Sequence, residues 1–95
     1  MGELVRIGMY EYTAQLQENL GGPQVIFHFD NGYGASVIQN QLSYGGNEGF
    51  WELAVLKFAK DGEWNLCYDT DITHNVIGWQ SPEEIDELLK RIQAL

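Results

Sequence analysis

The sequence predicts an α+β domain in which an antiparallel sheet of about five strands packs against one amphipathic C-terminal helix. Apolar residues alternate with period two along much of residues 25–68, and glycine-containing turns separate the alternating runs. From residue 81 the apolar period changes to that of a helix. The chain has 95 residues, of which 44% are hydrophobic, enough for a single domain with a packed core. We therefore expect residues 25–80 to form a β-meander and residues 81–95 to form the helix.

Residues 1–24 are expected to be a variable extension or a strand. The apolar alternation that begins at Val5 changes phase after Gly8, and a bulged strand near that glycine explains the change. Leu20–Pro23 is then the predicted hairpin loop. A helix over residues 10–20 that ends at the same loop is the competing prediction. The tyrosine and threonine content favours the strand.

The central strands are predicted from their alternation and from the turns between them. The predicted turns are Asn31–Gly34, Tyr44–Gly49 and Lys60–Gly62. The predicted strands are residues 25–30, 35–39, 50–58 and 64–68.

The C-terminal helix has a clear start signal. Ser81 is a predicted N-cap, Pro82 occupies the first helical position, and Glu84 completes a capping box. One apolar stripe follows at helical spacing: Ile85, Leu88, Leu89, Ile92 and Leu95.

The charge of the chain excludes several classes of partner. Fourteen acidic residues against five basic ones give a net charge of −9. Because this charge repels phosphates, we expect no direct binding to nucleic acid or to anionic membranes. Ten of the acidic residues follow residue 47, which leaves a basic protein surface as a suitable partner. A single cysteine and the lack of an apolar leader or span predict a cytoplasmic protein.

The segment Asp69–His74 is the best candidate for chemistry. Asp69, Asp71 and His74 are weak candidates for metal ligands, since carboxylates and imidazole bind metal ions. The segment lacks the glycine and the closing glutamate of a calcium loop, and Asp and Thr after a strand commonly form turns. We therefore favour turn chemistry and expect no metal and no cofactor.

Nucleophilic catalysis has weaker support still. Cys67 lies in an apolar strand, where burial is expected to raise the pKa of its thiol, and His28 is expected on a solvent-facing strand surface. A Cys67–His28 pair would lack an electropositive setting. We expect that the protein is not an enzyme.

The aromatic side chains near the turns are candidate interface residues. Tyr33, Tyr44 and Trp51 lie beside open loops, where rings serve as core or as interface anchors. Trp64 and Trp79 are expected to fill the core beneath the helix.

An ordered series of motifs resembles the small uncharacterised proteins of tailed bacteriophages and prophages. The motifs are residues 30–37 (DNGYGASV), 43–46 (SYGG), 51–56 (WELAVL), 67–70 (CYDT) with 72–73 (IT), and 76–79 (VIGW) before the helix. The resemblance spans residues 25–95. It implies a phage or prophage accessory protein in a bacterial cytoplasm, and it carries no catalytic residue.

These observations together predict a non-catalytic protein-binding module. The expected partner is a basic host or phage protein, and one version is an acidic inhibitor of a host nucleic-acid-binding or defence protein. The predicted contact residues are Glu83, Glu84, Asp86 and Glu87 with Tyr33, Tyr44 and Trp51. A small metal-dependent protein or enzyme built on Asp69–His74, and a phage structural subunit, are the alternatives. We also predict a homodimer, because the N-terminal strand carries few charges and would form a sheet edge.

Overall fold

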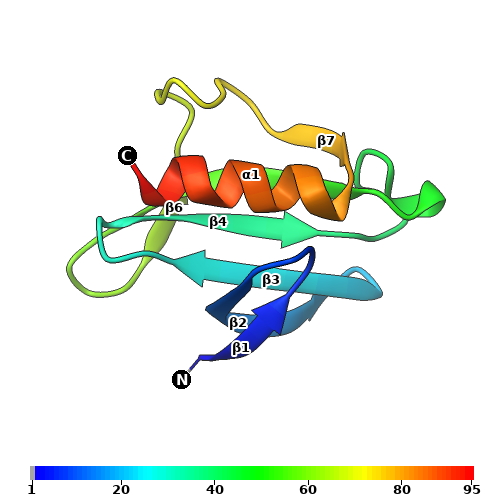
Figure 1. The fold of residues 1–95 in the computed structure, drawn as a ribbon, viewed down its shortest axis with the longest axis horizontal. Coiled ribbons are helices and arrows are strands. Elements are labelled where there is room, and N and C mark those ends of the chain that lie inside the picture. The colour runs from blue at the N-terminus through cyan, green and yellow to red at the C-terminus, as the bar shows by residue number, and fades with distance from the viewer. Residues whose placement is uncertain (1) are drawn as a thin grey trace.

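The computed structural model describes residues 2–95 and shows one antiparallel sheet with a helix packed on one face (Figure 1). The described strands are β1 (Glu3–Arg6), β2 (Glu11–Asn19), β3 (Gly22–His28), β4 (Tyr33–Ile38), β5 (Trp51–Phe58), β6 (Trp64–Leu66) and β7 (Ile77–Gln80). A short 3-10 turn, η1 (Gly46–Glu48), precedes β5, and the helix is α1 (Pro82–Gln93). Strands β1 to β6 are neighbours in chain order, and β7 pairs with β5. The predicted α+β fold is confirmed, with seven described strands rather than about five.

The N-terminal segment is a hairpin rather than one bulged strand. Strands β1 and β2 pair from Glu3–Ala14 to Arg6–Glu11, and residues 7–10 reverse the chain between them. The prediction of strand is confirmed, whereas the single bulged strand and the competing helix are wrong. Gly8 allows the reversal to pack on the helix, since a Cβ atom there would lie 2.6 Å from the carbonyl oxygen of Pro82.

The β2–β3 hairpin has a two-residue turn rather than the predicted four-residue loop Leu20–Pro23. Leu20 and Gly21 both have positive φ, 52° and 81°, as a two-residue type I′ turn requires. Strand β3 therefore begins at Gly22, and Pro23 lies opposite Glu18 within the ladder.

None of the strands predicted from the sequence corresponds to β7 (Ile77–Gln80). Its four residues pair with the first half of β5, while β6 pairs with the second half, on the same side of that strand. The irregular register between β5 and β7 and the shortness of the strand explain why alternation did not reveal it.

The core lies between α1 and one face of the sheet. Val25, Phe27, Val37, Leu53 and Val55 project from the three central strands into it. The buried apolar residues of the helix are those of the predicted stripe, Ile85, Leu88, Leu89 and Ile92, whereas Leu95 is 42% exposed. No helix within residues 2–95 is long and apolar enough to cross a membrane.

The predicted capping box at the start of α1 is present. The Ser81 hydroxyl accepts a hydrogen bond from the Glu84 amide (3.2 Å), and the Glu84 carboxylate accepts one from the Ser81 amide (2.9 Å). The helix start was therefore predicted correctly from four consecutive residues.

Candidate protein-binding surface

Three exposed aromatic rings gather where the glycine loop meets β7. Tyr44, Phe50 and Trp79 are 63%, 36% and 55% exposed, and we call them the aromatic cluster. The ring centroids of Phe50 and Trp79 lie 6.0 Å apart, and the Trp79 amide donates a hydrogen bond to the Tyr44 carbonyl (3.1 Å). Figure 1 shows β7 and the η1 loop at the end of the molecule where α1 begins. Trp79 thus lies outside the core, as does Trp64 on β6, which is 37% exposed, so the predicted core position of both residues is wrong.

The backbone at Trp79 is unusual for a bulky residue. Its φ of +58° lies in the left-handed region, which large side chains rarely adopt and which costs on the order of 1–3 kcal/mol. Two glycines let the neighbouring segments close in: a Cβ atom on Gly45 would lie 3.0 Å from the Trp79 Cα, and one on Gly78 would collide with the Tyr44 Cβ. Strained backbone that presents a large ring to solvent is typical of functional sites.

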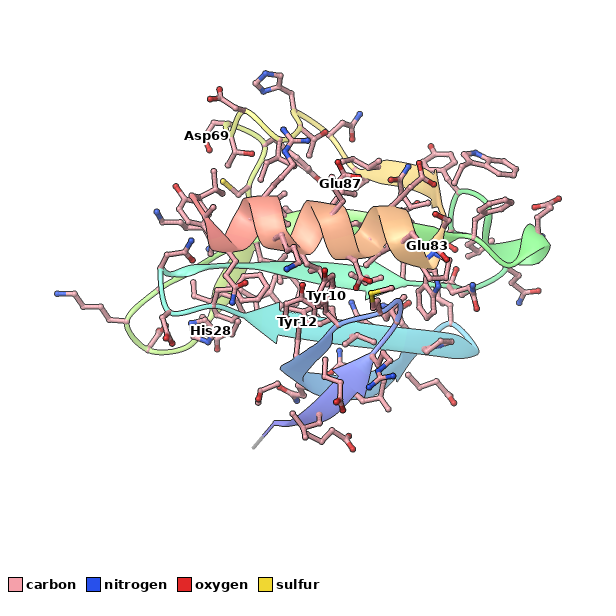
Figure 2. All side chains as sticks on the ribbon, viewed as in Figure 1. Tyr10, Tyr12, His28, Asp69, Glu83 and Glu87 are labelled. Atoms are coloured by element: carbon pink, nitrogen blue, oxygen red, sulfur yellow. The ribbon has the colours of Figure 1, made fainter. Side chains whose placement is uncertain are left out.

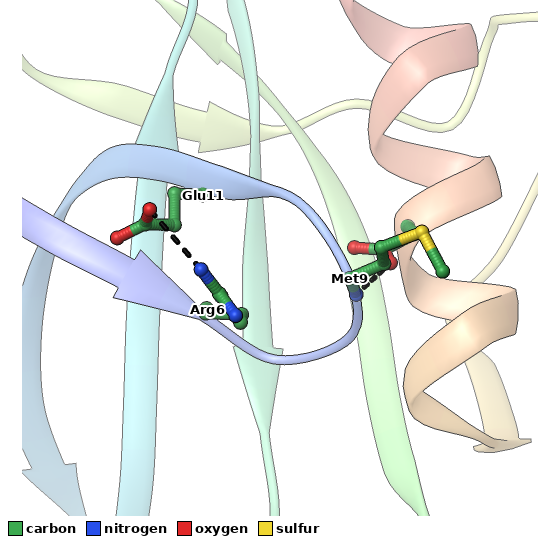
Figure 3. A network of polar contacts seen from close by, with 4 residues as sticks. Arg6, Met9 and Glu11 are labelled. Carbon is green, nitrogen blue, oxygen red and sulfur yellow. Dashed lines mark hydrogen bonds and ion pairs between the residues drawn. The ribbon is translucent and has the colours of Figure 1, made fainter.

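Two carboxylates on α1 remain unpaired beside this end. Glu83 and Glu87 are exposed, and Figure 2 shows both on the helix. The one ion pair within residues 2–95 joins Arg6 to Glu11 (3.2 Å, Figure 3), so neither helix carboxylate has a cationic partner in that range. Glu84 is exposed as well, but its side chain is engaged in the capping box.

Asp86 is not an outward carboxylate, so its expected place on the outer face of the helix is wrong. The side chain is 5% exposed and accepts a hydrogen bond from the Met9 amide (Figure 3). The β1–β2 loop covers this part of the helix, which a periodicity argument confined to residues 81–95 does not reveal. The second oxygen, Oδ1, is buried and has no hydrogen-bond partner among the described residues.

A small groove runs between this loop and the helix. Its volume is about 240 Å³, and we call it the helix groove, lined by Met9, Tyr10, Glu83, Asp86, Glu87 and Lys90. The Lys90 ammonium lies 3.7 Å from the centroid of the Tyr10 ring, a cation–π contact. The groove therefore combines an aromatic face with three carboxylates.

The other two predicted aromatic contacts lie apart from the cluster. Trp51 is half-buried and packs against the core. Tyr33 lies at the far end of β4, half-buried, with the Lys57 ammonium 4.1 Å from its ring centroid. Of the three predicted rings, the structure places only Tyr44 in the exposed cluster, and Phe50 and Trp79 join it.

Three side chains of the Asp69–His74 segment contact neighbours within residues 67–74, and Asp71 is exposed. Asp69 accepts a hydrogen bond from the Cys67 thiol (2.9 Å), Thr70 accepts one from the Ile72 amide (3.2 Å), and His74 Nδ1 lies 2.9 Å from the Tyr68 carbonyl oxygen. Within residues 2–95 no three His, Cys, Asp or Glu side chains are grouped closely enough to hold a metal ion. These contacts are the turn chemistry that the sequence favoured.

The Cys67 thiol and the His28 imidazole occupy separate environments. Burial raises the pKa of Cys67, as predicted, and the thiol bond it donates holds the pKa of Asp69 below its ordinary value. His28 is exposed, as predicted, and stacks on Phe58 with ring centroids 3.7 Å apart. Each side chain is already engaged by a different neighbour.

Comparison with protein-family models, curated proteins and solved structures finds no match for this chain. Sequence reasoning missed the β1–β2 loop as a part of this surface. The signal at Phe50 and Trp79 was an aromatic residue next to a glycine, which also occurs in ordinary cores.

Proposed function

We propose that this protein is a non-catalytic binding module that contacts a basic protein through the aromatic cluster and the exposed carboxylates of α1. The observation that carries the proposal is Trp79, a ring 55% exposed on a left-handed backbone, four residues before the unpaired carboxylate of Glu83. Protein interfaces combine aromatic anchors with a polar rim, and this end of the molecule supplies both.

Charge complementarity indicates the chemistry of the partner. A net charge of −9 favours association with a basic surface and accelerates it at low salt. Two carboxylates before the helix are less available, because Glu52 accepts a hydrogen bond from the Tyr44 amide and Asp61 accepts one from the Glu63 amide. Glu83 and Glu87 are the pair we assign to the contact.

We further propose that the module is a phage or prophage accessory protein in a bacterial cytoplasm. One form of that role is inhibition of a host nucleic-acid-binding or defence protein by occupying its basic groove. This setting depends on the sequence motifs alone. We favour binding over a metal-dependent activity because the candidate ligands Asp69 and His74 already bond within their loop.

Affinity capture from bacterial lysate tests the proposal with matched charge variants. Glu83→Lys/Glu87→Lys reverses the two α1 carboxylates, and Glu3→Lys/Glu18→Lys reverses two exposed carboxylates on β1 and β2 as the control. We expect the wild type and the control to retain the same basic protein, which added salt releases. The helix variant should lose it, as should Trp79→Ala. Capture that is equal for the helix variant and the wild type would contradict the proposed surface.

A further inference from the structure

The helix groove already holds one cation, supplied by the protein itself. The Lys90 ammonium lies 3.7 Å from the Tyr10 ring centroid, so one face of this ring already binds a positive group. Lys90 forms no ion pair within residues 2–95, which leaves the carboxylates of Glu83 and Glu87 free at the same groove. The lining groups carry three carboxylates against one ammonium, so the groove favours a further cation.

Asp86 gives a second, independent indication of a ligand. It lines the groove, it is 95% buried, and its Oδ1 atom lacks a hydrogen-bond partner among the described residues. A buried carboxylate without a full set of donors is costly, and a cation bound in the groove beside it lowers that cost through charge attraction. The other oxygen already accepts the Met9 amide, which fixes the orientation of the carboxylate.

The combination of one aromatic ring with several carboxylates favours a guanidinium over an ammonium. A guanidinium is planar, stacks on an aromatic face and donates to carboxylates through several N–H groups, whereas an ammonium makes one compact contact. The groove offers one ring and carboxylates on successive turns of the helix, in a volume of about 240 Å³ that suits one long side chain. Anionic groups are excluded by the charge of the lining.

We propose that the helix groove is the pocket for an arginine side chain of the partner protein, in which the guanidinium stacks on Tyr10 in place of Lys90 and donates to the carboxylates of Glu83 and Glu87, beside the buried charge of Asp86. This inference rests on the proposed function and names the residue type that the module recognises. Lys90 is then an internal competitor that occupies the ring in the free protein.

Titration of the full chain with N-acetyl-arginine amide, followed by amide NMR shifts, tests this pocket. We expect weak binding that shifts the amides of Met9, Tyr10, Asp86 and Glu87, and no such shifts with the uncharged isostere N-acetyl-citrulline amide. Tyr10→Leu should remove the binding, and because the Tyr10 side chain is 45% exposed this variant should keep the wild-type fold and spectrum.

Removal of the internal competitor gives the sharper result. Lys90→Gln should raise the affinity for the arginine probe by roughly two- to fivefold, which corresponds to the free energy of an exposed cation–π contact. Arg91→Gln removes the same charge one position away and should change affinity by less. Equal effects of the two variants, equal binding of the citrulline probe, or shifts spread over distant carboxylates such as Asp61 would overturn the pocket.

The two proposals fail in distinguishable ways. If Glu83→Lys/Glu87→Lys abolishes partner capture while the arginine probe does not bind, the protein-binding surface stands and the arginine pocket is wrong. If the probe binds as described while that variant captures its partner normally, the pocket exists but the proposed function is wrong.

Discussion

Asn31, in the turn between β3 and β4, donates its side-chain amide to the carbonyl oxygen of Ile92 near the end of α1, at 2.9 Å. The same amide lies 3.2 Å from the carbonyl oxygens of Gln93 and Leu95, so one side chain serves several unpaired acceptors of the helix terminus. Its oxygen accepts the Tyr33 amide (3.0 Å), which closes the turn. A single residue therefore joins the central hairpin to the helix.

Asn31→Asp should destabilise the fold although it preserves the turn. The carboxylate keeps the acceptor for Tyr33, loses the donor to Ile92 and places a negative charge at the negative end of the helix dipole. We expect a loss of about 1–2 kcal/mol in the free energy of unfolding. Urea denaturation measures it, and Asp30→Asn, which alters an exposed neighbour, is the control. Equal stabilities of Asn31→Asp and wild type would show that contacts other than those of Asn31 stabilise the end of α1.

Ser81→Ala tests the other end of the helix. The change removes the hydroxyl that accepts the Glu84 amide, so we expect a loss of about 1 kcal/mol. For a domain of this size the melting temperature should fall by roughly 4–8 °C. Melting followed by circular dichroism measures the shift, and an unchanged transition would contradict the capping box.

Tyr12→Phe should leave stability unchanged or raise it. The Tyr12 hydroxyl is buried without a hydrogen-bond partner among the described residues, and burial followed by the Asp86 charge raises its pKa. Phenylalanine keeps the edge contacts to Phe27 and Phe29 while it removes the unsatisfied group. In urea denaturation Tyr12→Leu, which loses the ring, should be the less stable variant. A loss above about 1 kcal/mol for Tyr12→Phe would show that the hydroxyl has a partner.

Substitutions at Trp79 should separate backbone strain from binding. Glycine accepts a φ of +58° freely, whereas alanine retains the strain, so Trp79→Gly should exceed Trp79→Ala in stability by about 1 kcal/mol. Both variants should lose partner capture, because both remove the exposed ring. Thermal unfolding of the two variants measures the difference, and a less stable glycine variant would contradict a strained backbone at this position.

The features that could be predicted from the sequence are those encoded by adjacent residues. The helix start follows from residues 81–84, and the central strands follow from alternation and glycine turns. The hairpin loop at residues 7–10 depends instead on Asp86 and Pro82, far along the chain, so Gly8 resembled a bulge. The burial of Asp86 has the same origin. The exposure of Trp79 depends on how β7 meets the glycine loop, and nothing local distinguishes it from a core tryptophan.

The homodimer stays a prediction, since the structure describes one chain. Strand β1 does lie at a sheet edge, as expected, and it is only four residues long. A short edge strand offers few backbone groups for pairing with a second copy.

Amide hydrogen exchange of the complex with the captured partner tests the central claim most directly. If the aromatic cluster and α1 carboxylates form the contact, protection should rise in residues 44–50 and 79–90, and in residues 8–11 where the helix groove is filled. The β5–β6 turn at residues 59–63 should exchange as in the free protein. Protection confined to that turn or to β1, with residues 79–90 unchanged, would contradict the account.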